Sequence, residues 1–137
     1  MTNPDNHNPL EQLFSKIQFN ENGLIPAIAQ QFDSREVLMM AWMNKAAIQE
    51  TLNNDRVCYF SRSRNQLWRK GETSGQIQTL KKFRIDCDGD TILLLVDQTG
   101  VACHTGRRNC FFEEVSKDGN TKIVADVLKN PDDLYKK

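Results

Sequence analysis

Most residues that could carry chemistry lie in one stretch, DCDGDTILLLVDQTGVACHTGRRNCF, at positions 86–111. It contains Cys87, Cys103 and Cys110, with fifteen residues between the first two and six between the last two. Cysteine thiolates are preferred zinc ligands, and three protein ligands leave a fourth position open for water, as in catalytic zinc sites. Because the spacing differs from the CxxC pairs of zinc ribbons, a structural zinc site and buried free cysteines stay open as alternatives.

The same stretch begins with three closely spaced aspartates, Asp86, Asp88 and Asp90. In an extended backbone alternate side chains project to opposite faces, so we expect the three carboxylates on one face and Cys87 on the other. Three crowded carboxylates repel one another unless a cation lies among them, and their oxygens suit magnesium. An EF-hand loop is excluded because its glycine would sit at position four instead of six. The pattern therefore predicts a magnesium site separate from the thiolate site.

A second segment, SRSRNQLWRKGETSG at 61–75, combines basic side chains, small hydroxyls and glycines. Arginine forks, hydroxyls and exposed backbone amides suit a phosphate-bearing ligand, although the P-loop spacing is absent. A solvated basic loop is an equally good interpretation from composition alone. A zinc module that binds RNA or a protein through residues 62–70 is a further alternative, disfavoured by zero net charge and only two tryptophans.

Composition limits the class of protein. The 137 residues suit one domain, and 39% hydrophobic residues suffice for a modest core. Eighteen basic and eighteen acidic residues give no overall field that would favour nucleic acid or a membrane. With no signal peptide and no apolar run of spanning length, we expect a cytoplasmic protein, in which the cysteines bind metal or stay free instead of forming disulfides.

The elements that must position these groups follow from hydrophobic periodicity and turn signals. We expect an α+β fold with a mostly antiparallel sheet and a few short helices. Met39, Met40 and Met43 are predicted to fill the core, and Pro26 to mark an edge or the beginning of its strand. The predicted strands cover 24–31, 36–43, 56–61 and 92–96. The predicted helices cover 10–17, 46–52 after the N-cap Asn44, and 121–128. We expect residues 1–9 to be a flexible tail and residues 116–137 to be a polar C-terminal extension.

Three motifs in order, LWRKGETSG, DCDGD and ACHTGRRNCF, resemble phosphoribosyl-AMP cyclohydrolase of histidine biosynthesis. The resemblance covers roughly residues 18–112, and it implies a cyclohydrolase domain at 10–115. The one departure is Asn109, where the family more often has serine. The implied reaction is hydrolysis of the N1–C6 bond of the adenine ring in 1-(5-phosphoribosyl)-AMP, a substrate with two phosphates.

The resemblance also implies the assembly and the metals. It implies an intertwined homodimer with one zinc per subunit, held by Cys103 and Cys110 of one chain and Cys87 of the other. It implies magnesium at Asp86, Asp88 and Asp90. Zinc lowers the pKa of bound water and so supplies hydroxide at neutral pH.

The remaining site residues follow from the same resemblance. His104 beside Cys103 is the expected proton shuttle, with orientation of a ligand as the alternative. Arg107 and Arg108 either contact phosphates or form a solvated turn. The expected substrate contacts are Arg62, Arg64, Trp68, Arg69, Lys70, Glu72, Thr73 and Ser74.

Overall fold

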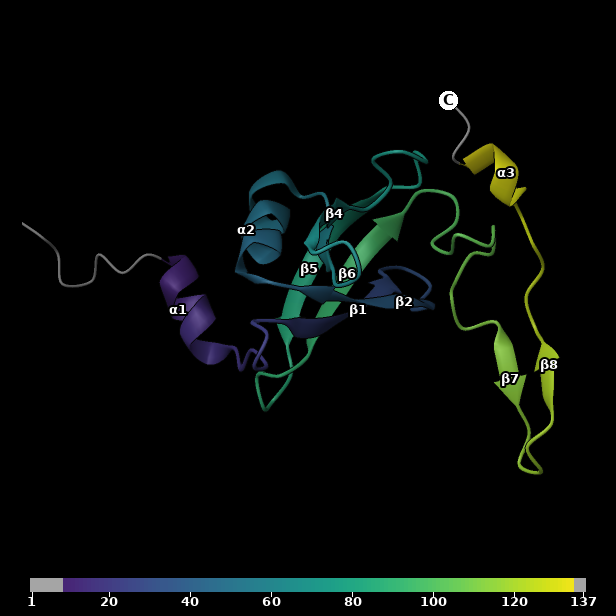
Figure 1. Ribbon diagram of the computed structural model, residues 1–137, viewed down its shortest axis with the longest axis horizontal. Helices are drawn as coiled ribbons and strands as arrows, with labels where there is room; N and C mark the ends of the chain where they lie inside the picture. The colour runs from purple at the N-terminus through teal and green to yellow at the C-terminus, as the bar shows by residue number, and fades with distance from the viewer. Residues whose placement is uncertain (1–8, 135–137) are drawn as a thin grey trace, which may run out of the picture.

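A computed structural model describes residues 9–134 (Figure 1). Its elements in chain order are α1 (Pro9–Lys16), β1 (Ile25–Gln31), β2 (Val37–Met43), α2 (Lys45–Asn54), β3 (Cys58–Ser61), β4 (Gln66–Arg69), β5 (Gln78–Ile85), β6 (Ile92–Gln98), β7 (Glu113–Val115), β8 (Thr121–Ile123) and α3 (Pro131–Leu134). Six strands form a curled sheet in the order β4-β3-β2-β1-β6-β5, and all neighbours are antiparallel except β1 and β6. The predicted α+β class with a mostly antiparallel sheet is confirmed.

Strand β1 lies in the middle of this sheet, between β2 and β6. Its residues alternate between buried and half-buried, as expected for a strand with one face on the core. Pro26 marks the beginning of the strand, one of the two predicted positions, and precedes Ala27, where the ladder with β6 starts. Because β6 pairs with β1 in a parallel ladder, the two strands run in the same direction.

Helix α2 closes one end of the core. Asn44 is its N-cap, as predicted, and accepts a hydrogen bond from the Ala47 amide at 2.8 Å. Met39 and Met43 are buried, but the prediction for Met40 is wrong, since 45% of it is exposed. In β2, burial departs from strict alternation, because Leu38 and Met39 are both buried and Met40 faces solvent.

The local structure differs from two interpretations of the sequence. The basic segment at 61–75 is not all loop, because Gln66–Arg69 forms β4 and pairs with β3 in a hairpin. Residues 121–128 are not a helix, because the turn at Ser116–Asn120 pairs Thr121–Ile123 with β7. The helix starts later, at Pro131, where the fixed φ of proline suits a first helical position.

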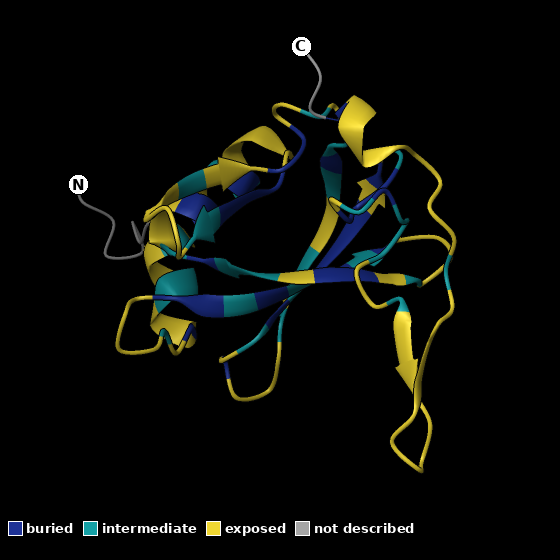
Figure 2. Cartoon of the chain, turned by 45° about the vertical axis from the view of Figure 1, so that its right-hand side comes forward, coloured by how far each residue is buried: buried dark blue, intermediate teal, exposed yellow. Residues whose placement is uncertain are grey.

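The C-terminal arm is residues 111–134, and its β7–β8 hairpin extends away from the six-stranded sheet (Figures 1 and 2). Every residue of β7 and β8 is exposed, and the predicted boundary at 115/116 falls inside this hairpin. Residues 1–8 of the predicted tail lie outside the described residues, and Pro9 already belongs to α1. Among the described residues, no helix is both long and apolar enough to cross a membrane. The exposed large apolar side chains of the arm are Phe111, Val115, Ile123, Val124, Val127 and Leu128.

Candidate active site

Asp86, Asp88 and Asp90 lie together in the turn between β5 and β6, with ligand oxygens within 4.8 Å of one another. The prediction that they cluster is confirmed, but the predicted extended backbone is wrong. The turn is closed by the Asp86 amide, which donates to the Thr91 carbonyl at 2.9 Å, and by the Gly89 amide, which donates to the Asp86 carbonyl at 3.1 Å. The carboxylates therefore converge by a tight turn and not by strand alternation.

The protonation of this aspartate turn reflects its crowding. The pKa of Asp90 is raised, first by the hydrogen bond that it shares with Asp86 and then by slight desolvation and the nearby negative charges of Asp86 and Asp88. Slight desolvation raises the pKa of Asp86, but the side chain of Asp90 and nearby backbone amides outweigh it and lower the pKa overall. A nearby cation would favour the charged form of all three carboxylates. The oxygen donors and their spacing suit a hard divalent ion.

Cys103 and Cys110 lie on one irregular loop, residues 99–110, which follows β6 and is here called the cysteine loop. The Cys103 amide donates to the Arg107 carbonyl at 3.1 Å, so the loop folds back on itself. The Cys110 amide donates to the Leu38 carbonyl of β2 at 2.7 Å, which fastens the end of the loop to the sheet. The Cys103 sulfur accepts a hydrogen bond from the Thr105 hydroxyl at 3.1 Å.

Burial and neighbouring groups shift the pKa of the Cys110 thiol. The pKa of Cys110 is raised to about 12, first by desolvation and then by the charge of Cys103 and a hydrogen bond to it, while Lys70 opposes the shift. Cys58 is buried, as predicted, and desolvation raises its pKa to about 12 as well. A divalent cation between Cys103 and Cys110 would offset the repulsion between two thiolates, so the pair suits zinc.

Gly106 allows the C-terminal arm to close over the cysteine loop. It has a positive φ of 88°, and a Cβ atom there would lie only 1.9 Å from the carbonyl oxygen of Lys129. The amides of Leu128 and Lys129 donate to the Gly106 carbonyl at 2.8 and 3.1 Å. Arg107 adds a hydrogen bond from its Nε to the Ala125 carbonyl at 2.9 Å. Glycine is therefore required at this position both for its backbone angle and for the close approach.

Arg108 holds the cysteine loop to the two central strands. Its guanidinium donates to the carbonyls of Gln98 and Gly100 at 3.0 and 2.6 Å and to the Gln31 side chain at 2.9 Å. It also pairs with Glu36 at 3.5 Å. The solvated-turn interpretation of Arg108 is wrong, because protein acceptors hold its guanidinium; the phosphate contact stays a prediction.

Buried glutamines continue this network into the core, and the sequence analysis missed them. The Gln98 side-chain amide lies 2.8–3.3 Å from the carbonyls of residues 76, 77, 99 and 101, and its oxygen accepts from Gln78 at 2.9 Å. Gln78 in turn accepts from the Tyr59 hydroxyl at 2.7 Å. The available signal was a polar, uncharged residue at the end of a mostly apolar strand, since such a residue needs partners when buried.

A cleft of about 800 Å³ brings the basic segment together with His104. His104 is exposed and lies next to the buried Cys103, so the cleft reaches the cysteine loop. Arg62 lies outside the cleft and stacks on the Trp42 ring, with its guanidinium carbon 4.8 Å from the ring centroid. The predicted substrate contacts that line the cleft are Arg64, Trp68, Arg69, Lys70, Glu72, Thr73 and Ser74.

Several cleft residues already have protein partners. Arg69 makes a bidentate pair with Glu50 of α2, with distances of 2.5 and 2.8 Å. Trp68 is 39% exposed, and its ring centroid lies 5.4 Å from that of Tyr59. Lys70 is buried and donates to the Ala102 carbonyl at 2.6 Å. These partners leave the open side of the cleft to Arg64 and the hydroxyls of the 71–75 turn.

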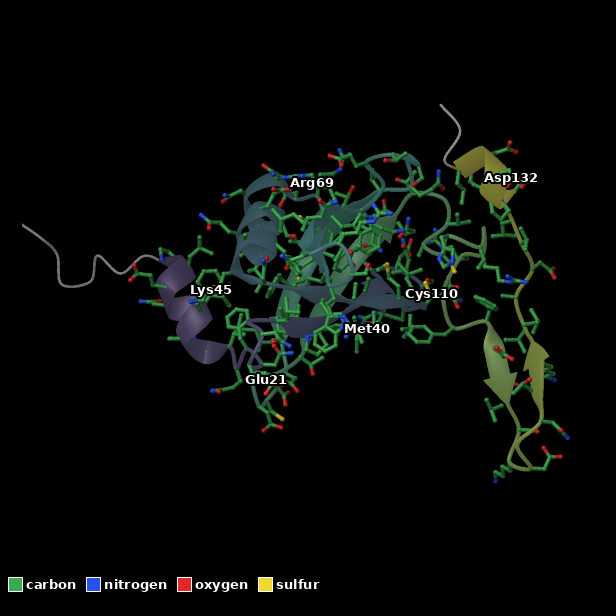
Figure 3. All side chains as sticks on the ribbon, in the orientation of Figure 1. Glu21, Met40, Lys45, Arg69, Cys110 and Asp132 are labelled. Carbon is green, nitrogen blue, oxygen red and sulfur yellow. The ribbon has the colours of Figure 1, made fainter. Side chains whose placement is uncertain are left out.

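Cys87 lies far from the other two cysteines of the motif. It belongs to the turn before β6, whereas the cysteine loop follows β6, and seven residues of extended strand separate the two ends. At ~3.3 Å per residue, that strand places them roughly 20 Å apart. Figure 3 shows Cys110 toward the opposite end of the sheet from the turn between β5 and β6. Among the described residues, the aspartates alone form a group of three possible metal ligands within one chain.

Comparison with known proteins decides the family. The family model described as phosphoribosyl-AMP cyclohydrolase matches residues 39–112, more than half of the chain, and this range contains all six predicted metal ligands and His104. The chain belongs to the phosphoribosyl-AMP cyclohydrolase family. The recognition from the three motifs is confirmed, and the chain is an enzyme, a cyclic amidine hydrolase of histidine biosynthesis.

Relatives named phosphoribosyl-AMP cyclohydrolase match nearly the whole chain. The protein from Paramagnetospirillum magneticum is 66% identical over 91% of this chain and 94% of its own length. The protein from Hydrogenovibrio crunogenus is 63% identical over 93% of this chain and 86% of its own. The protein from Granulibacter bethesdensis is 61% identical over 92% of this chain and 98% of its own. The similarity therefore extends well beyond the three motifs.

We expect Gln98→Leu to lower the free energy of unfolding by about 3 kcal/mol. The substitution preserves side-chain size but leaves the Gln78 amide and several carbonyls without their buried partner, and each unpaired group costs ~1–3 kcal/mol. Urea unfolding followed by circular dichroism measures the loss. Gln12→Leu, on the exposed face of α1, is the control and should change stability little. Equal stability of the two variants would contradict a supporting role for the network.

Proposed function

We propose that the enzyme hydrolyses the N1–C6 bond of the adenine ring in 1-(5-phosphoribosyl)-AMP, with zinc, to give the phosphoribosyl-formimino-aminoimidazole carboxamide ribotide. The observation that carries this proposal is the cleft that joins His104 of the cysteine loop to the basic segment. A nucleotide bound in such a cleft can contact both a residue that transfers protons and residues that bind phosphate. The family named for this activity supports the substrate.

Cys103 and Cys110 provide two of the zinc ligands in this proposal. They lie on one loop, interact electrostatically, and are fastened to β2 and to the Arg108 network. When bound, zinc supplies hydroxide at neutral pH by lowering the pKa of water from 15.7 to ~7. The loop itself orients the two thiolates and places His104 beside them.

The third ligand is Cys87 of a second copy of the chain. Within one chain Cys87 lies at the opposite end of β6, so the three thiolates converge only in a homodimer. The C-terminal arm supports such an assembly. Its two-stranded hairpin is wholly exposed and carries apolar side chains, and an isolated hairpin of this kind is only marginally stable in water. A partner subunit would bury this surface.

Magnesium at the aspartate turn is a separate part of the proposal. Three exposed carboxylates whose oxygens lie within 4.8 Å of one another can bind one hard cation together with water. In the assembled dimer the turn also carries Cys87, so an ion there would order the segment that supplies the third thiolate and bring positive charge for a phosphate.

His104 moves the proton that the reaction requires. As the N1–C6 bond breaks, the departing ring nitrogen must gain a proton, and an imidazole can release one near neutral pH. His104 is exposed to the cleft and adjacent to a zinc ligand, so it can reach a ring held over the thiol pair. The phosphates of the substrate lie toward Arg64, Thr73 and Ser74 on the open side of the cleft.

Mixing two inactive variants tests the shared site. Cys87→Ser and Cys103→Ser should each abolish turnover, measured by the absorbance change on ring opening. After random re-association, about half of the dimers are hybrids with one intact site of two, so we expect about a quarter of wild-type activity to return.

A matched control uses Cys103→Ser mixed with Cys110→Ser. Each site takes both Cys103 and Cys110 from the same chain, and each variant chain lacks one of the two. Both sites of every hybrid dimer are therefore defective, and no activity should return. Recovery in neither mixture, despite demonstrated subunit exchange, would indicate self-contained sites and contradict the proposal.

His104→Ala should keep zinc and lower kcat by about 10²- to 10⁴-fold, because the departing nitrogen loses its proton donor. Metal content by atomic absorption and the pH dependence of kcat measure the two effects separately. One limb of the wild-type pH profile should disappear in the variant. An unchanged profile would exclude His104 as the proton carrier.

A further inference from the structure

Lys70 differs from the other basic residues of the cleft because it is buried. Only 8% of it is exposed, although it follows the largely exposed strand β4. Its backbone amide donates to the Val57 carbonyl at 3.1 Å, which fixes the start of the side chain against the core. A buried lysine ammonium needs a hydrogen-bond partner, and the direction of the side chain identifies that partner.

The Lys70 side chain points toward the cysteine loop. Its ammonium donates to the Ala102 carbonyl at 2.6 Å and lies 5.6 Å from the centre of the Trp68 ring. Ala102 directly precedes Cys103, so this hydrogen bond reaches across from β4 to the backbone that carries a zinc-ligating residue. It is a contact between residues 32 positions apart in the sequence.

Burial and the neighbouring thiols act on the charge of Lys70 in opposite directions. Burial lowers the pKa of Lys70, while negative charge on Cys110 and Cys103 opposes that shift. The hydrogen bond to Ala102 holds the ammonium next to the backbone of Cys103, in a largely buried setting where charges are weakly screened.

We propose that Lys70 is a positioning residue for the zinc-binding thiol pair and not a phosphate ligand. Its ammonium fixes the Ala102 carbonyl and brings a positive charge to the loop that carries the two thiolates. Three thiolates around one Zn²⁺ carry a net negative charge, and a buried cation next to them offsets it. This inference rests on the proposed zinc site at Cys103 and Cys110.

The two roles of Lys70 predict different consequences of its removal. A phosphate ligand contributes to substrate binding, so its loss raises KM and leaves metal affinity unchanged. A positioning residue contributes to the metal site, and the loss of such partners typically weakens metal affinity 10- to 100-fold. Arg64, which faces the open cleft, provides the comparison for the first behaviour.

The experiment measures zinc affinity by competition with a chromogenic chelator, together with kcat and KM, in the full-length protein. Lys70→Met keeps the length of the side chain but removes its charge and donors, and we expect a 10- to 100-fold loss of zinc affinity. Lys70→Arg keeps both and should stay within about threefold of wild type. If the methionine variant does not fold, Lys70→Gln replaces it, with loss of affinity again expected because the charge is absent.

Two controls make the result specific. Lys82→Met removes an exposed lysine of β5 and should change neither zinc affinity nor kinetics. Arg64→Met should raise KM while zinc affinity stays at the wild-type value. Cobalt substitution adds a spectroscopic check, since the thiolate-to-cobalt absorption should change in Lys70→Met and remain in Lys70→Arg.

Wild-type zinc affinity in Lys70→Met or Lys70→Gln would overturn the inference, and so would an equal loss of affinity in Lys70→Arg. Failure of the underlying zinc proposal looks different. In that case Cys103→Ser itself would retain zinc, whatever the result at Lys70.

Discussion

The central constraint on this enzyme is that an irregular loop must hold two thiols side by side. Loops lack the ladder hydrogen bonds that fix a strand, so side chains must satisfy much of the backbone of residues 99–110. The side chains of Arg108 and Gln98 do this, because together they donate hydrogen bonds to the four carbonyls of residues 98–101. The Leu38 carbonyl then fixes Cys110 to the sheet. The geometry of the thiol pair therefore depends on a polar network in an otherwise apolar core.

Strand β6 determines how the site can be completed. It begins directly after the aspartate turn with Cys87 and ends at the cysteine loop, so the strand that carries the core also separates Cys87 from the thiol pair. Its parallel ladder with β1 makes this separation rigid. In the proposed zinc site a second subunit would supply the third thiolate, and the exposed apolar hairpin of the arm would give that subunit a surface to cover.

Sequence patterns predicted much of the fold and the clustering of the candidate metal ligands. The physical reasons for the two successes differ. Apolar periodicity identified β1, β2, β6 and α2, because local burial decides these elements. The convergence of Asp86, Asp88 and Asp90 was correct although the reason was wrong, since a tight turn and not strand alternation brings them together. The role of Arg108 and the inward direction of Lys70 depend on contacts between residues far apart in the chain, which periodicity cannot reveal.

X-ray absorption at the zinc edge tests the central claim most directly, because it counts the sulfur atoms around the metal. The account predicts three sulfurs at ~2.3 Å and one lighter atom per zinc in the wild-type dimer. The count should fall to two in Cys87→Ser if that variant still binds zinc. Two or fewer sulfurs in the wild type, or no change on loss of Cys87, would contradict a zinc ion held between two chains.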